Sequence, residues 1–174
     1  MQNLQKRKLD ALMKRVIEGD NDAFCLLYEA TAKGIFAFAY SYLGKREDAE
    51  DVTQETFFAA KRKAHLYRPG TDVRAWLFQI AKNLSLDELR KKKNSAAPLG
   101  DALENTLSVK PQLTELDALT ACLDEAEREI VLLHAVWQYK HREIAELTGT
   151  PLGTVTWKYK KALAKLRDYL KEDL

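Results

Sequence analysis

The sequence predicts an all-α protein made of two small helical domains, residues 1–93 and 113–174, joined by a flexible linker over residues 94–112. Apolar residues recur at helical spacing along most of the chain, and the alternating pattern typical of strands is nearly absent. Between the two domains this periodicity stops, and Ser, Ala, Pro, Gly and Asn accumulate as in a flexible connection. Hydrophobic residues make up 46% of the chain and charged residues 31%, which is a composition that can bury a core.

The first domain is predicted to contain four helices. The first helix stops at Gly19, and Asp20 or Asn21 can cap the second. The apolar positions of the second helix continue past Gly34, which interrupts the helix without ending it, and stop at Gly44.

A loop separates the third helix from the fourth. The third is predicted over residues 46–64 and the loop over residues 65–72, where a Pro-Gly pair forms the turn. Asp72 can cap the fourth helix, which is expected to run to about Lys92. Trp76 falls on the apolar stripe of that helix, so we expect it in the core or half-buried at its edge.

The third helix carries an acidic and polar patch in its first half. Asp51, Gln54 and Glu55 lie at positions i, i+3 and i+4, so they share one surface. A helix dipole favours acidic side chains near its N-terminus, and simple capping would therefore explain them. The same patch could also bind a basic partner, and the residues alone leave both interpretations open.

The second domain ends in a predicted helix-turn-helix. A short helix over residues 113–123 and a helix capped by Asp124 come first, followed by two helices within residues 141–166. Gly149 suits the left-handed end of the first of these, and Pro151 can begin the second. In such a motif the second helix reads DNA with its N-terminal residues.

That second helix is basic. No acidic residue lies between Pro151 and Arg167, and this stretch contains five lysines and arginines, which suits contact with a phosphate backbone. A solvated lysine face on a three-helix bundle is the alternative. The side chains expected to face DNA are Thr154, Thr156, Trp157, Lys160 and Lys161, with Lys158 nearer the phosphates.

Neither a catalytic nor a metal site is expected. Cys25 and Cys122 lie within apolar patterns and are expected to be buried free thiols in a reducing compartment. The three histidines show no spacing typical of general acid–base pairs or metal ligands, and no Gly-rich phosphate loop is present, so no cofactor is expected.

The N-terminus lacks the apolar core of a signal peptide, and no run reaches the ~18 apolar residues of a membrane span. We therefore expect a cytoplasmic protein.

Three stretches resemble the extracytoplasmic-function group of sigma factors in the sigma-70 family. The stretch from Asp48 to Phe57 resembles region 2.2 of that family, and the stretch from Arg74 to Asn83 resembles region 2.3 leading into region 2.4. Glu143-Ile-Ala and Gly153-Thr-Val resemble region 4.2. The stretches occur in the family's order with a linker between them.

The resemblance implies a non-catalytic subunit that binds core RNA polymerase and recognises the −35 and −10 elements of promoter DNA. It implies polymerase contacts at Asp48, Asp51, Gln54 and Glu55. It also implies that the loop over residues 65–72 captures a flipped −10 base, since a base must leave the stack to be read on its pairing edge. The side chains expected at −10 DNA are Tyr67 as a candidate pocket wall, Asn83 on the same strand, and Arg90, Lys91 and Lys92 on the phosphates. An exposed loop tyrosine without a DNA role is an equally open interpretation of Tyr67. An anti-sigma factor and a monomeric free state are further expectations.

The chain departs from the family pattern in the reading helix. Trp157 and Lys158 stand where the family usually has Ser-Arg, and Lys161 replaces an arginine. Lysine cannot form the bidentate fork of arginine on guanine, so the preferred −35 sequence is expected to differ. A helix-turn-helix repressor would explain residues 141–166 but neither the acidic patch nor the helix that contains Trp76 and Asn83. An enzyme is disfavoured because the catalytic, metal-ligand and phosphate-loop motifs are absent.

Overall fold

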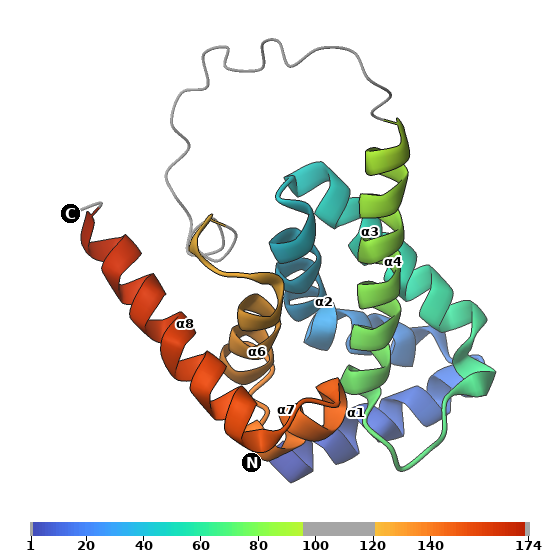
Figure 1. The fold of residues 1–174 in the computed structure, drawn as a ribbon. Helices are drawn as coiled ribbons and strands as arrows, with labels where there is room; N and C mark the ends of the chain where they lie inside the picture. Colours follow the sequence, from blue (N-terminus) through green and yellow to red (C-terminus); the bar gives the residue numbers. More distant parts are fainter. Residues whose placement is uncertain (1, 96–120, 173–174) are drawn as a thin grey trace.

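The computed structural model describes residues 2–95 and 121–172, and within these ranges every regular element is a helix (Figure 1). The all-α prediction is therefore confirmed. In order, the elements are α1 (Gln2–Ile17), α2 (Asn21–Leu43), α3 (Arg46–Arg62), the 3-10 helix η1 (Ala64–Leu66), α4 (Val73–Ser95), α6 (Glu125–Ala135), α7 (His141–Thr148) and α8 (Leu152–Glu172).

Capping residues set the predicted helix boundaries in the N-terminal half. The Asp20 carboxylate accepts a hydrogen bond from the Ala23 backbone N–H at 3.0 Å and so caps α2. Gly44 ends α2 in the left-handed conformation, with φ of 67°, while Gly34 stays inside the helix as predicted. Asp72 caps α4 through the Arg74 backbone N–H at 3.0 Å.

Two boundaries differ from the predictions. The third helix ends at Arg62 instead of residue 64, because residues 64–66 tighten into η1 before the loop. The fourth helix continues past Lys92 to Ser95, and the run of strong helix formers at its end gives no reason to stop earlier. The rest of the predicted linker, and all but the last residues of the helix predicted over residues 113–123, lie outside the described residues.

The core of the N-terminal half is formed where α2 packs between α1, α3 and α4. Its fully buried large side chains include Met13, Leu27, Phe38, Leu77 and Phe78. Cys25 is exposed, so the expectation of a buried thiol is wrong there, because α2 turns Ala23 and Leu27 inward and Cys25 outward. Cys122 is half-buried.

The C-terminal half is a three-helix unit in which α8 packs on α6 and α7. Asp124 and Glu127 form a reciprocal capping box at the start of α6. Gly149 ends α7 with φ of 67°, as predicted. Pro151 precedes α8 and does not begin it: its carbonyl accepts the Val155 N–H at 3.0 Å, which makes it the capping residue.

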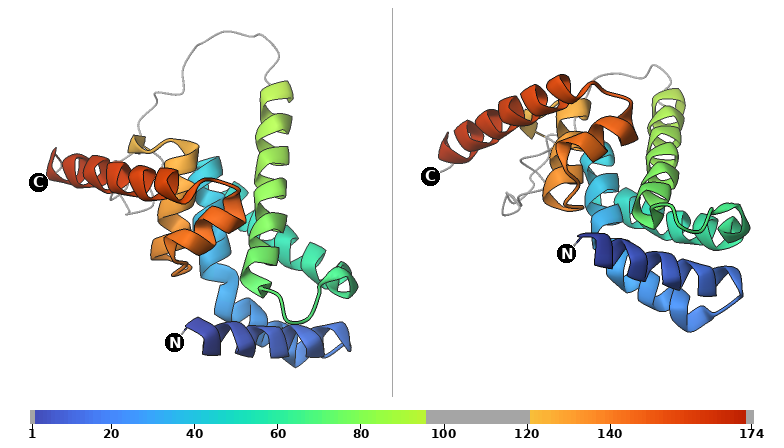
Figure 2. Two further views of the ribbon diagram at one scale, coloured as in Figure 1. Left: turned by 60° about the horizontal axis from the view of Figure 1, so that its bottom comes forward. Right: turned by 90° about the horizontal axis from the view of Figure 1, so that it is seen from below.

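The two halves contact each other directly, and Figures 1 and 2 show α6 lying beside α2. The indole of Trp137, only 4% exposed, covers Gly34, where an added Cβ would lie 2.8 Å from two ring carbons. Arg74 donates from Nη1 to the Trp137 carbonyl at 3.0 Å. Lys82 on α4 bonds both carboxylate oxygens of Glu129 on α6, at 2.7 and 2.9 Å. We call this arrangement, in which the two halves contact each other, the closed form. It combines close packing with directional polar contacts.

Candidate functional site

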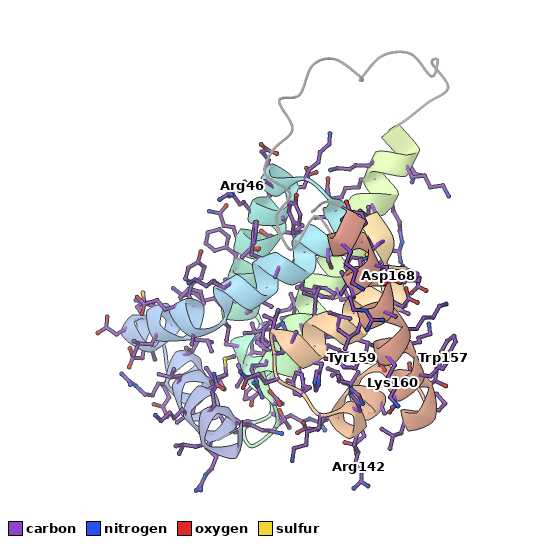
Figure 3. All side chains as sticks on the ribbon, turned by 90° about the vertical axis from the view of Figure 1, so that its left-hand side faces the viewer. Arg46, Arg142, Trp157, Tyr159, Lys160 and Asp168 are labelled. Carbon is purple, nitrogen blue, oxygen red and sulfur yellow. The ribbon has the colours of Figure 1, made fainter. Side chains whose placement is uncertain are left out.

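The second helix of the helix-turn-helix presents an aromatic and basic surface. Trp157 is 59% exposed, and Figure 3 shows it pointing away from the ribbon. The Lys161 ammonium lies 5.0 Å from the centre of its ring, in cation–π contact. Lys160 is exposed beside them, whereas Lys158 and Thr154 are half-buried. These residues stand together on one helix, as predicted.

Not all the cations of α8 are equally available. Lys165 Nζ donates to Glu127 Oε2 at 2.6 Å, and Lys161 Nζ lies 3.5 Å from Glu127 Oε1. Burial alone would raise the pKa of Glu127, but hydrogen bonds from the Lys165 ammonium and the Asp124 backbone hold it below its usual value. Glu127 therefore stays charged and ties α8 to α6. Among the described residues, neither Lys158 nor Lys160 has a carboxylate within ion-pair distance, and Lys160 is the more exposed of the two.

Three rings support the turn between α7 and α8. The ring centres of His134, His141 and Tyr159 lie 4.7 to 5.0 Å apart. Thr156 Oγ1 lies 3.3 Å from His141 Nδ1 and is half-buried, so this predicted DNA-facing residue also holds the two helices together. Burial, then His134 and Lys160, lower the pKa of His141, which favours a neutral ring.

The sequence interpretation missed one cation of the helix-turn-helix. Arg142, the second residue of α7, is exposed and points away from the ribbon in Figure 3. The first helix of such a motif crosses the DNA backbone, so an arginine at its start is well placed for phosphate contact. The signal in the sequence was a basic residue just inside a helix that ends at the turn glycine.

The acidic patch lies along an exposed ridge of α3. Asp51, Gln54 and Glu55 are all exposed, as expected for a docking surface. On one side, a groove of about 700 Å³ runs between α2 and α3, with Tyr28 and Phe36 among its lining residues. A second groove, between α3 and α4, lies on the other side. The patch is thus flanked by concave surfaces, which suits a partner that wraps around the helix.

Asp48 and Lys92, predicted to serve different partners, bind each other in the free chain. The Lys92 ammonium donates to the Asp48 carboxylate across the α3–α4 contact. Arg90 pairs with Asp87 at 3.0 Å, and the Lys91 ammonium lies 3.6 Å from a Glu88 oxygen. Three of the four cations in the basic run of α4 therefore lie beside an acidic side chain, a feature that the run itself did not suggest.

The loop before α4 differs from expectation at Tyr67. Its side chain is only 3% exposed: the hydroxyl donates to Asp10 Oδ1 at 2.9 Å, and the ring makes an edge contact with Trp76 at 5.5 Å. The expectation of an exposed tyrosine is therefore wrong, because α1 offers it a buried acceptor. Trp76 is half-buried, as predicted, and Asn83 is exposed with its Oδ1 accepting from Gln79 at 3.2 Å.

Tyr67 and Asn83 both belong to the α4 side of the N-terminal half, but Tyr67 contacts Asp10 and Trp76 whereas Asn83 bonds Gln79, so the structure does not bring these two side chains together. Lys82, beside Asn83, holds Glu129 of the C-terminal half, so α6 lies next to the predicted −10 face of α4.

Within residues 2–95 and 121–172 no group of three His, Cys, Asp or Glu side chains could hold a metal ion. No helix in the same ranges is long and apolar enough to cross a membrane.

Comparison with known proteins connects both halves to one family. The model of Sigma-70 region 2 matches residues 27–95, and that of Sigma-70, region 4 matches residues 113–166. The RNA polymerase sigma factor CarQ of Myxococcus xanthus is 31% identical over 171 residues, which cover 92% of this chain and 96% of that protein. The ECF RNA polymerase sigma factor EcfG of Rhodopseudomonas palustris is 29% identical over 83% of each chain.

A solved structure has the same fold. The sigma factor RpoE from Bartonella quintana, in complex with the anti-sigma factor NepR, superimposes with a TM-score of 0.66 at 25% identity. The match covers 87% of this chain and 98% of that one, so it includes helices of both halves.

Proposed function

The chain belongs to the extracytoplasmic-function group of the sigma-70 family, and from this premise we propose that it binds core RNA polymerase and directs it to specific promoters. The observation that carries the proposal is that one chain combines two features. Its N-terminal half matches Sigma-70 region 2, and its C-terminal half contains a helix-turn-helix whose second helix exposes Trp157 and Lys160. A repressor would need only the second of these. The chain acts as a transcription initiation factor, and we propose that it has no catalytic activity of its own.

At the −35 element, α8 would enter the major groove with Trp157, Lys160 and Lys161 outward. The indole offers an apolar surface for a thymine methyl group, and the lysines offer donors for guanine or phosphate. Arg142 on α7 would hold the neighbouring phosphates and fix the angle at which α8 enters.

At the polymerase, the ridge formed by Asp51, Gln54 and Glu55 would meet a basic helical partner. Asp48 would join this contact once its bond to Lys92 is released. The flanking grooves and the exposed aromatic side chain of Tyr28 support docking here, because aromatic side chains are enriched at protein interfaces.

At the −10 element, the loop over residues 65–72 would receive an unpaired base and Asn83 would contact the same strand. The Asn83 amide offers both a donor and an acceptor, as base-edge reading requires. Arg90, Lys91 and Lys92 would follow the phosphates after exchanging their carboxylate partners for DNA. Since Tyr67 is buried, we assign it to the floor of this loop and not to an exposed wall.

An anti-sigma factor is the proposed regulator, by analogy with the complex of RpoE and NepR. The free chain is proposed to be monomeric and cytoplasmic, where core polymerase and promoter DNA are available.

Reconstitution tests the whole proposal. The chain is mixed with core polymerase, purified as a complex, and assayed by run-off transcription on a promoter library. Enrichment of a two-part motif with a fixed spacer is the expected result. Tight, dimeric DNA binding without polymerase, and no transcription with it, would support the repressor instead.

A further inference from the structure

Helix α1 holds the loop that precedes α4, although the match to Sigma-70 region 2 begins only at residue 27. α1 packs against η1 and α4, and Figure 2 shows it running beneath the loop that joins them. Asp10, in the middle of α1, is 8% exposed, which is unusual for a carboxylate without a structural or functional task.

The two oxygens of Asp10 have separate partners. Oδ1 accepts one hydrogen bond from the Tyr67 hydroxyl at 2.9 Å and another from the Gly70 backbone N–H at 2.7 Å. Oδ2 lies 3.0 Å from the Lys14 ammonium. One carboxylate oxygen therefore ties together two points of the loop, three residues apart.

The intervening turn has little else to fix its shape. Arg68, Pro69, Gly70 and Thr71 are all exposed. Within the turn, the Thr71 N–H and the Thr71 hydroxyl both donate to the Arg68 carbonyl, at 3.2 and 2.7 Å, and Gly70 takes a left-handed conformation with φ of 89°. These bonds close the turn on itself but do not attach it to the rest of the domain. Such a segment samples many conformations unless side chains restrain it, and a receptor loop that is ordered beforehand loses less entropy on binding.

The restraint is charge-assisted. Burial would raise the pKa of Asp10, but the Gly70 N–H, Lys14 and Tyr67 together hold it below its usual value. Hydrogen bonds to an ionised acceptor are stronger than neutral ones. The contact is therefore suited to holding a loop and not only to filling space.

We propose that Asp10 is a positioning residue for promoter reading, which holds the loop of residues 65–72 in the shape that receives an unpaired −10 base. This inference rests on the proposed function of the loop. Asp10 itself does not touch DNA. It acts through Tyr67 and Gly70, so that the pocket is formed before the base arrives.

The test compares variants of the holoenzyme. Asp10→Ala removes both loop bonds, and Asp10→Asn keeps an oxygen that can accept them but loses the charge. Asp20→Ala is the matched control, because Asp20 is also an ion-paired carboxylate at the α1–α2 junction, but it bonds Arg15 and the Ala23 N–H and not the loop. Each holoenzyme is titrated with single-stranded non-template oligonucleotides that carry the −10 element with each of the four bases at the flipped position.

The readout is the ratio of dissociation constants for the preferred base and the other bases, measured well below the melting temperature of every variant. Loss of charge-assisted bonds of this kind should reduce the ratio by about tenfold in Asp10→Ala. Asp10→Asn should recover most of the ratio, and Asp20→Ala should keep the wild-type ratio despite a lower melting temperature. Binding to core polymerase and to −35 duplex should be unchanged in all three.

Two results would overturn the role of Asp10 but leave the proposed function of the loop intact. One is a wild-type ratio in Asp10→Ala; the other is an equal loss in Asp20→Ala, which would show a general effect of stability. If Asp10→Ala does not fold, Tyr67→Phe provides the loss-of-contact variant, because it removes the hydroxyl that bonds Asp10 and keeps the ring in place; a wild-type ratio in that variant would then overturn the inference. A wild-type holoenzyme that transcribes from its promoter but does not discriminate bases at this position would overturn the loop's proposed function and this inference with it.

Discussion

Replacing Gly34 with alanine should separate the two halves of the chain. The added Cβ would lie 2.8 Å from Cε2 and Cζ2 of Trp137, whereas non-bonded carbons prefer about 3.5–4.0 Å. Both groups are rigid: one belongs to the backbone of α2, and the other is the indole ring. The contact therefore cannot be relieved by a small side-chain rotation.

The magnitude follows from comparing the closed form with an open one. Alanine stabilises the interior of a helix by about 1 kcal/mol relative to glycine, but α2 is helical in both forms, so this gain cancels. Overpacking at a buried contact costs about 1–3 kcal/mol, and this cost falls on the closed form alone. The closed-to-open equilibrium should shift by roughly 5- to 150-fold towards the open form, the range that corresponds to such an energy.

Gly153→Ala is the matched control. Gly153 lies in α8, where an added Cβ meets nothing within 4 Å, so the substitution changes helix propensity without a clash. Solution X-ray scattering should give a larger radius of gyration for Gly34→Ala only. Acrylamide quenching of Trp137, in a background where Trp76 and Trp157 are both replaced by phenylalanine, should increase in the same variant because opening exposes the indole.

Opening also has a functional consequence. The −35 and −10 elements are separated by roughly 25 base pairs, or about 85 Å of duplex at ~3.4 Å per pair. A chain in which Lys82 on α4 bonds Glu129 on α6 cannot extend its two DNA-reading surfaces over that distance. Gly34→Ala should therefore speed the formation of holoenzyme. If scattering, quenching and holoenzyme formation all match those of Gly153→Ala, the closed arrangement does not restrain the chain in solution.

Four further outcomes are expected. Reversing the charges of Asp51 and Glu55 together should weaken core binding at least tenfold while leaving the melting temperature within a few degrees, since exposed charges contribute little to stability; wild-type affinity in a competition assay would contradict the docking surface. Lys160→Ala should lower the slope of log affinity against log salt by about one unit for −35 DNA, measured by fluorescence anisotropy. The pKa of His141 is lowered in the folded chain, so its contribution to the free energy of unfolding should be fully present above about pH 6.5 and should be lost as the pH drops below that value. His141→Gln should flatten this part of the pH profile in urea titrations. Asn83→Ala should reduce permanganate reactivity of the −10 region on duplex promoters, and a pre-melted bubble should restore opening but not base preference.

Local signals predicted the helices well because their causes are local. Asp20, Asp72 and Asp124 cap the helices that follow them, and Gly44 and Gly149 end helices in the left-handed conformation. Each of these features depends on a few neighbouring residues, so it is visible in the sequence. The helix-turn-helix and the exposed face of α8 were predictable for the same reason.

Contacts between distant segments were not predictable. Asp10 and Tyr67 are 57 residues apart, and Lys82 and Glu129 are 47 apart. An exposed loop tyrosine and a buried one have the same local sequence, and only the position of α1 decides between them. The outward position of Cys25 has a different cause, since apolar neighbours on both sides conceal which face of α2 is buried.

The ion pair between Asp48 on α3 and Lys92 on α4 suggests how polymerase and DNA binding are coupled. Asp48 belongs to the proposed polymerase surface and Lys92 to the proposed DNA surface, and in the free chain each neutralises the other. A polymerase cation that takes over Asp48 would release Lys92 for a phosphate, and DNA that takes over Lys92 would release Asp48. By thermodynamic linkage, polymerase and DNA then each raise the binding affinity of the chain for the other by the same factor. Both side chains are partly exposed, and such pairs contribute about 0.2–1 kcal/mol, so the coupling from this pair is at most a few-fold. That is too weak to act as a switch. It is enough to favour DNA binding by the assembled holoenzyme over DNA binding by the free chain, in the direction that initiation requires.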